Sequence, residues 1–211
     1  MPDFELEQAY LEKHPGAIVA GLDEAGRGPW AGPVVAAATI LNVEKLPSNL
    51  RDKLDDSKKL TARRREILFS ALNDSSAAII GVGQATAQEI DDINILNATY
   101  RAMARAVEAL RNKVDLALVD GNKIPPLSCR AMSVIKGDGK SLSIAAASVI
   151  AKVTRDRLMT GLAGQHPGYG WETNMGYGTA KHQAGLARLG VTQHHRRSFA
   201  PIRAALGAAI S

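Results

Sequence analysis

Carboxylates follow apolar stretches at distant points of the chain. Asp23 and Glu24 come directly after the apolar run 18–22, and Asp120 comes after the run 116–119. Ligand sites in open α/β sheets lie at the carboxyl ends of strands, so acids placed there can face a common pocket. A carboxylate in such a place is costly to desolvate unless a cation or a hydrogen-bond donor meets it. The alternative is that each acid only begins a turn, because Asp is a common turn former.

A further acid, Asp138, precedes the longest predicted helix, over about 141–162, and we place it at the end of the fifth predicted strand. A helix N-terminus is electropositive and favours a carboxylate or a phosphate nearby. Ordinary helix capping explains Asp138 equally well on local grounds.

Asp156 competes with Asp138 for this role. It lies roughly 27 Å further along the chain if the helix is continuous, at about 1.5 Å per residue, so both acids cannot serve one pocket. Asp156 is flanked by Arg155 and Arg157 and follows Lys152 by one helical turn, so an ion pair explains it. We therefore assign Asp138, and not Asp156, to the acidic set.

The predicted acidic set is Asp23, Glu24, Asp120 and Asp138, with no His or Cys beside any of its members in the sequence. Oxygen ligands alone suit the hard ions Mg²⁺ and Mn²⁺ better than zinc. Two such ions can activate a water molecule and stabilise a leaving oxyanion in phosphodiester hydrolysis. The acids therefore predict metal-dependent hydrolysis without a covalent nucleophile.

Beside the first acids stands a glycine-rich turn, Gly26, Arg27 and Gly28. Glycine lets the backbone approach a ligand and leaves its N–H groups available for hydrogen bonds. Backbone pressed on a sugar could detect the 2′-hydroxyl that distinguishes RNA from DNA. A simple tight turn between two strands is the alternative.

Hydrophobic patterning predicts a single α/β domain over 1–211 on a mixed five-stranded sheet, with a helical C-terminal portion from about residue 179. The first two strands are close enough to pair as an antiparallel hairpin. The second of the helices named below, 96–110, carries an apolar stripe typical of core packing. The expected strands are 17–22, 34–41, 77–83, 115–119 and 130–135; the expected helices are 61–72, 96–110, 141–162, 179–189 and 202–210, with an ordered loop at 164–178.

Composition points to a polyanionic partner. The 211 residues carry a net charge of +5, and 45% of them are hydrophobic, which excludes a disordered chain. Cys129 is the single cysteine, so neither an internal disulfide nor a multi-cysteine zinc site can form. The N-terminal residues are acidic and lack the basic-then-apolar order of a signal peptide, and the apolar runs fall short of a membrane span. We expect a cytoplasmic protein, and a monomer because no heptad pattern is present.

Several blocks together resemble type 2 ribonuclease H, the bacterial ribonuclease HII family. They occur in family order from residue 18 to about 202, and seven in order make a specific match. The blocks are Gly21–Pro29, Asp56–Leu60, Val119–Gly121, Lys136–Asp138, Ala145–Asp156, Gly176–Thr179 and His194–Phe199. Gln193 and Ala200 stand where the family often has Glu and Gly, which affects only detail of the C-terminal region.

The resemblance implies a ribonuclease H-like fold and names the four acids as the metal-binding and catalytic set. It implies that Gly26, Arg27 and Gly28 recognise the ribose 2′-hydroxyl at an RNA–DNA junction. It also implies that Tyr177 packs on the sugar beside the cut and that Lys58 or Lys59 holds a phosphate. The implied reaction cleaves the RNA strand of hybrids and nicks beside ribonucleotides embedded in DNA, leaving 3′-hydroxyl and 5′-phosphate ends.

Two other functions are weaker. A non-catalytic nucleic-acid-binding module would gain affinity by replacing carboxylates near phosphate, so the four acids argue against it. A nucleotide-binding loop at Gly81-Val82-Gly83 lacks the third glycine at the needed spacing.

Aromatic and histidine residues of the C-terminal half have structural explanations. We expect His194 and His195, together with Arg196 and Arg197, to form a basic surface or to pack a loop rather than to bind metal, because adjacent side chains point apart. Trp30 and Trp171 are expected to anchor core or loops.

Overall fold

Five strands form one mixed sheet in the order β3-β2-β1-β4-β5. The structure is a computed structural model that describes residues 1–208. β1 pairs antiparallel with β2 and parallel with β4, and the remaining pairs are antiparallel β2–β3 and parallel β4–β5. The bounds are β1 Val19–Ala25, β2 Val34–Leu41, β3 Ala78–Ala85, β4 Leu116–Asp120 and β5 Arg130–Val134. The predicted mixed five-stranded sheet and its first hairpin are confirmed.

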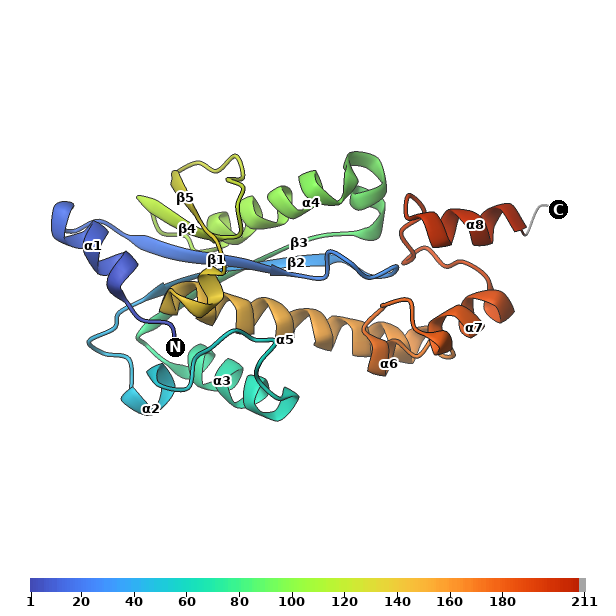
Figure 1. Ribbon diagram of the computed structural model, residues 1–211, viewed down its shortest axis with the longest axis horizontal. Coiled ribbons are helices and arrows are strands. Elements are labelled where there is room, and N and C mark those ends of the chain that lie inside the picture. Colours follow the sequence, from blue (N-terminus) through green and yellow to red (C-terminus); the bar gives the residue numbers. More distant parts are fainter. Residues whose placement is uncertain (209–211) are drawn as a thin grey trace.

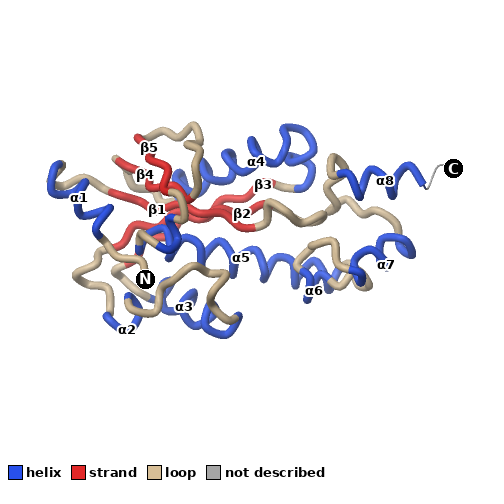
Figure 2. The backbone as a smooth tube through the Cα atoms, viewed as in Figure 1, coloured by secondary structure: helices blue, strands red, loops and turns tan. Residues whose placement is uncertain are grey.

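Helices cover both faces of this sheet (Figures 1 and 2). α4 (Ala87–Ala109) packs on one face, and α5 (Leu142–Gln165) packs on the other, where α3 (Ala62–Asp74) lies beside it. The central strands are therefore buried on both sides, which explains their continuous apolar runs. The predicted stripe on α4 is core: Met103, Val107 and Leu110 are buried.

α5 lies against β1 at a distance that only glycine permits. A Cβ atom on Gly21 would lie 2.2 Å from the backbone of Ser143. The first turn of α5 is capped by Ser141, whose side chain accepts a hydrogen bond from the Ile144 N–H. This close contact fixes the position of β1 relative to the beginning of α5. The contact residue, Gly21, lies two residues before Asp23.

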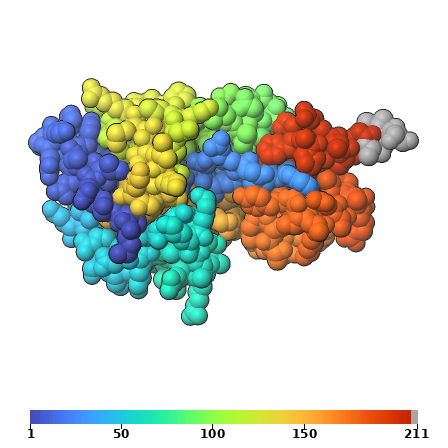
Figure 3. Space-filling model, in the orientation of Figure 1, coloured from blue at the N-terminus to red at the C-terminus, as the bar shows by residue number. Residues whose placement is uncertain are grey.

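The C-terminal helices lie beyond the end of the sheet and form one end of an elongated molecule (Figure 3). They are α6 (Trp171–Asn174), α7 (Ala180–Leu189) and α8 (Ala200–Ala208). α7 confirms the helix predicted at 179–189, while α6 interrupts the expected loop 164–178. α8 begins two residues before the predicted helix 202–210, whose last two residues lie outside the described part of the chain.

Some elements differ from the sequence-based expectations. α1 (Glu5–Lys13) and the short α2 (Ser48–Arg51) were not predicted, because neither shows a clear apolar periodicity. α4 begins earlier than expected, at a capping box in which Thr86 and Glu89 bond each other's backbone. Asn94 has a φ of 65° and separates the first part of α4, residues 87–93, from the predicted stripe. No helix among residues 1–208 is long and apolar enough to cross a membrane.

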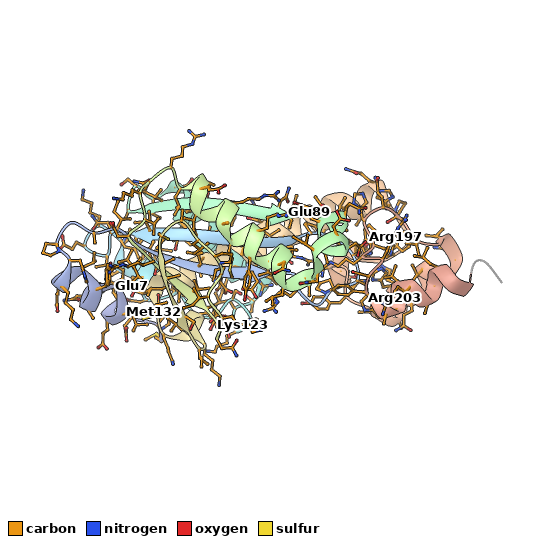
Figure 4. The ribbon with its side chains drawn as sticks, turned by 90° about the horizontal axis from the view of Figure 1, so that it is seen from above. Glu7, Glu89, Lys123, Met132, Arg197 and Arg203 are labelled. Atoms are coloured by element: carbon orange, nitrogen blue, oxygen red, sulfur yellow. The ribbon has the colours of Figure 1, made fainter. Side chains whose placement is uncertain are left out.

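The buried Glu7 of α1, labelled in Figure 4, forms hydrogen bonds with residues at the beginning of α5. Its Oε1 atom accepts hydrogen bonds from the hydroxyls of Ser141 and Ser143 and from the Ser143 N–H at 3.1 Å. The preceding Asp3 forms backbone hydrogen bonds with Lys140 and Leu142 on either side of Ser141. The N-terminal segment therefore braces the junction that follows Asp138.

We predict that Glu7→Ala lowers the free energy of unfolding by roughly 2 to 3 kcal/mol, because it leaves three buried donors without their acceptor. Urea denaturation followed by circular dichroism measures the change. The matched control is Glu12→Ala on the exposed part of the same helix, which should cost less than about 0.5 kcal/mol. Equal effects of the two substitutions would contradict the bracing role.

Candidate active site

Three carboxylates from separate segments meet at one edge of the sheet. Asp23 lies near the end of β1, Asp120 ends β4, and Asp138 lies in η1 (Gly137–Gly139), the 3₁₀ turn before α5. One oxygen of each lies within 4.8 Å of the others. Asp23 and Asp120 are brought together because β1 and β4 are parallel neighbours, with Leu22 opposite Val119.

The turn before α5 holds both Asp138 and Asp120 in place. Lys136 has a left-handed φ of 56°, which turns the chain sharply after β5. The Gly137 N–H then donates to Oδ1 of Asp120 at 2.7 Å. Asp138 was expected to end the fifth strand; that strand ends instead at Val134, because the left-handed residue stops the strand and begins the turn.

Glu24 lies at the margin of this cluster. Successive side chains of a strand leave the backbone towards opposite faces, so Glu24 departs from β1 in a different direction from Asp23, although its charge still acts on Asp23. Its Oε1 atom pairs with Arg27 at 3.3 Å, and it is not one of the three grouped acids. The structure thus groups three of the four predicted acids and places the fourth beside them.

Asp156 lies apart from the cluster, as expected from its position along α5. It pairs with Lys152 at 2.7 Å, one helical turn away. The ion pair that we predicted for Asp156 is therefore made by Lys152, and Arg155, which we also considered, points elsewhere.

Burial and mutual repulsion shape the electrostatics of the acids. Burial, followed by the charges of Glu24 and Asp120, raises the pKa of Asp23 well above its ordinary value. Burial also raises the pKa of Asp138, with the charges of Asp120 and Asp56 adding to it. The pKa of Glu24 is raised by burial, although Arg27 opposes that shift. A cation placed among such carboxylates would favour their ionised forms, because it offsets both burial and mutual repulsion.

Lys58 supplies one positive charge at the cluster. Its Nζ atom lies 3.7 Å from Oδ2 of Asp138 and 4.0 Å from Oδ1 of Asp56. Partial burial alone would lower the pKa of Lys58, but the charges of Asp23 and the neighbouring acids raise it. Lys59 instead pairs with Asp55 at 3.2 Å. Of the two predicted lysines, Lys58 is the one that faces the acids.

One lysine cannot balance three close carboxylates, so the donor set fits a divalent cation. The ligands are all oxygen, half-exposed to fully buried, and come from rigid elements. This is the coordination chemistry of Mg²⁺ and Mn²⁺ rather than of zinc.

The glycine-rich turn and Tyr177 lie side by side. A Cβ atom on Gly28 would lie 3.5 Å from Cε1 of Tyr177, which is 49% exposed. Gly26 has a φ of 96°, a conformation that L side chains rarely adopt. The glycine-rich turn and Tyr177, four of the six predicted substrate-binding residues, therefore lie together beyond the end of β1.

The C-terminal histidines are structural. Thr192 donates its N–H to Nδ1 of His195 at 3.0 Å, so Nε2 of His195 carries the proton that meets Nε2 of His182 at 3.1 Å. Nδ1 of His182 in turn donates to the carbonyl of Tyr177 at 3.0 Å. His195 therefore packs a loop, one of the two expectations, and the acid cluster includes no histidine. Trp171 is buried beside this pair, as expected of an anchor.

Arg155 and Arg196 are the residues whose importance the sequence did not reveal. Both are buried, and both bind backbone carbonyls of the segments that carry the glycine-rich turn and Tyr177. Arg196 was expected on a basic surface or in a packed loop, and only the second holds. Nothing in the sequence indicated that these two arginines are buried, because basic residues in a helix or near a chain end are usually exposed.

The fold is that of the ribonuclease H class. The structure of ribonuclease H2 from Pyrococcus horikoshii OT3 superposes with a TM-score of 0.76 at 30% identity, covering 90% of this chain and 98% of that one. Bst-RNase HIII has the same fold, with a TM-score of 0.71 at 16% identity, covering 97% of this chain and 81% of that one.

Sequence comparison narrows the class to one family. The family model described as Ribonuclease HII matches residues 20–202. Ribonuclease HII of Rhodospirillum rubrum is 56% identical over 98% of this chain and 92% of its own length. That of Jannaschia sp. is 57% identical over 95% of this chain and 96% of its own length. The chain belongs to the ribonuclease HII family, metal-dependent endoribonucleases that act on RNA–DNA hybrids.

We predict that stabilisation by Mn²⁺ grows as pH rises from about 5 to about 7.5. The raised pKa values of Asp23, Glu24 and Asp138 mean that the metal-free folded protein keeps protons there to a higher pH than the unfolded chain does. The stability this confers is complete below the unfolded pKa, near 4, and is lost as pH rises through the folded pKa. Mn²⁺ must displace these protons, so it binds more tightly at higher pH.

Thermal melting with and without Mn²⁺ at the two pH values measures this effect. Asp23→Asn is the control, since it removes a ligand and should flatten the pH dependence. The same Mn²⁺-induced rise in melting temperature at both pH values would show that these carboxylates do not hold the ion.

Proposed function

We propose that this protein hydrolyses the RNA strand of RNA–DNA hybrids and nicks duplex DNA 5′ of embedded ribonucleotides, leaving 3′-hydroxyl and 5′-phosphate ends. The observation that carries the proposal is the cluster of Asp23, Asp120 and Asp138, whose oxygens lie within 4.8 Å of one another. We further propose that it acts as a monomeric, single-domain enzyme in the cytoplasm.

Asp23, Asp120 and Asp138, with Glu24 beside them, would hold Mg²⁺ or Mn²⁺, with two ions during hydrolysis. When bound, such ions lower the pKa of an attacking water and stabilise the departing oxyanion. The rigid origin of the ligands in β1, β4 and η1 fixes the place of the scissile phosphate relative to the sheet. No side chain of the chain is required as a covalent nucleophile.

Lys58 would contact the phosphate that enters the cluster. Its ammonium lies 3.7 Å from Asp138 and its side chain is largely exposed, so it can turn towards an incoming anion. Lys59 forms an ion pair with Asp55, and its positive charge would help to attract the phosphate backbone to the same place. A phosphate contact of this kind adds affinity without adding sequence preference.

Recognition of RNA would fall to the surface formed by Gly26, Arg27, Gly28 and Tyr177. Tyr177 is exposed beside Gly28, so its ring can pack on a sugar while the backbone N–H groups of the turn face the same ligand. Backbone donors can read a 2′-hydroxyl at any base, which suits cleavage beside isolated ribonucleotides.

The test is a labelled DNA duplex holding one ribonucleotide. We predict a single nick 5′ of that ribonucleotide with Mg²⁺ or Mn²⁺ and none with chelator. Asp23→Asn should lose activity by roughly three orders of magnitude or more while it stays folded, because a metal ligand is lost. Binding without cleavage in the wild-type protein would support a non-catalytic nucleic-acid-binding module instead.

Asp138, in the turn before α5, and Asp156, within α5, offer a matched pair. Asp138→Asn should reduce cleavage by roughly three orders of magnitude, because it removes one of three clustered ligands. Asp156→Asn should stay within about twofold of wild type, since it only breaks a partly exposed ion pair with Lys152. Steady-state rates on the single-ribonucleotide duplex decide between them, and the reverse ranking would show that Asp138 is misassigned.

A further inference from the structure

Two arginines are buried without an acidic partner. Arg155 is 1% exposed and Arg196 is 0% exposed. Within residues 1–208, neither makes an ion pair within 4.0 Å. Burial lowers the pKa of Arg155 to about 10 and that of Arg196 to about 9, so both stay charged at neutral pH. A buried charge must be met by other polar groups.

Backbone carbonyls of the glycine-rich segment meet the charge of Arg196. Its Nη2 donates to the carbonyl of Gly26 and its Nη1 to the carbonyl of Arg27 at 2.8 Å. Its Nε donates to the carbonyl of Gly32 at 3.0 Å, and Nη2 also reaches the carbonyl of Pro33 at 3.3 Å. One planar guanidinium thus fixes both ends of the segment that contains the turn.

Arg155, from α5, binds carbonyls of the same glycine-rich segment and of the segment before Tyr177. It donates to the carbonyls of Ala31 at 3.2 Å, Pro33 at 3.0 Å and Met175 at 3.0 Å. Met175 lies two residues before Tyr177, so Arg155 ties the tyrosine segment to the glycine-rich one. A Cβ atom on Gly26 would lie 1.9 Å from Nε of Arg155. The glycine at 26 is therefore required by the buried arginine, whereas a Cβ on Gly28 would point towards Tyr177.

The inward carbonyls determine where the N–H groups of the turn point. In a trans peptide the carbonyl and the N–H of the same unit point in opposite directions. The carbonyls of Gly26 and Arg27 point to Arg196, so the N–H groups of Arg27 and Gly28 point away from it. Both residues are exposed. Neither N–H donates a hydrogen bond to any group of the described chain.

We propose that Arg196 is the positioning residue for ribose recognition: by holding the carbonyls of Gly26 and Arg27 inward, it presents the N–H groups of Arg27 and Gly28 to the 2′-oxygen of the substrate. Arg155 fixes the turn relative to Tyr177 in the same way. The proposal rests on the proposed function, because that function supplies the ribose.

The test uses Arg196→Lys, which keeps the charge but has a single nitrogen in place of the three that contact the carbonyls at both ends of the segment. The matched control is Arg197→Lys in the adjacent, exposed position of the same C-terminal segment (Figure 4). Fluorescence anisotropy measures binding to a DNA duplex with one ribonucleotide and to the identical all-deoxy duplex. Ca²⁺ replaces Mg²⁺, under conditions in which no cleavage is detected.

We expect the wild-type protein and Arg197→Lys to prefer the ribonucleotide duplex, and Arg196→Lys to lose about tenfold of that preference. The affinities of Arg196→Lys for the all-deoxy duplex and for Mn²⁺ should stay within about twofold of those of the wild type. An unfolded variant would lose both affinities. An unchanged preference in a folded Arg196→Lys would overturn the positioning role. No preference and no cleavage in the wild type would instead overturn the proposed function.

A second measurement needs no variant. The amide resonances of Arg27 and Gly28 in ¹⁵N-labelled wild-type protein should shift on addition of the ribonucleotide duplex and shift much less with the all-deoxy one. Identical shifts with both duplexes would overturn the proposal even if Arg196→Lys fails to fold.

Discussion

Repulsion among three carboxylates is the constraint on which the site depends. Asp23, Asp120 and Asp138 would separate if their backbones were free, because burial removes the water that screens their charges. The sheet prevents this: parallel pairing of β1 with β4 fixes the first two acids, and the Gly137 N–H joins the turn of Asp138 to Asp120. The folded chain thus stores an unfavourable arrangement of charge that a divalent cation relieves.

The remainder of the molecule can be understood as support for this arrangement. Gly21 lets α5 approach β1, and Glu7 braces the beginning of α5 where the third acid is presented. On the other side of the acids, two buried guanidiniums give the glycine-rich turn its shape by binding its carbonyls. Negative charge is concentrated at the metal-binding cluster, and positive charge lies beneath the surface proposed to meet the sugar. The proposed metal site and the proposed recognition surface therefore have buried charges of opposite sign.

The sequence predicted what depends on local pattern. Apolar runs ending in acids located Asp23 and Asp120, and the position of Asp138 before a long helix, together with the distance to Asp156, selected the third acid. What it could not predict depends on distant contacts. Lys58 and Lys59 are equivalent in sequence, and only folding directs Lys58 towards Asp138 and Lys59 towards Asp55. Arg196 lies in a run of basic residues that is typical of a surface, and its burial follows from carbonyls more than 160 positions away.

Diffraction from crystals soaked in Mn²⁺, recorded where manganese scatters anomalously, tests the central claim most directly. We expect anomalous density between the carboxylates of Asp23, Asp120 and Asp138, at metal–oxygen distances of about 2.2 Å, as for a hard divalent ion. Well-ordered crystals with no anomalous density among these three side chains, or with manganese bound only elsewhere, would contradict it.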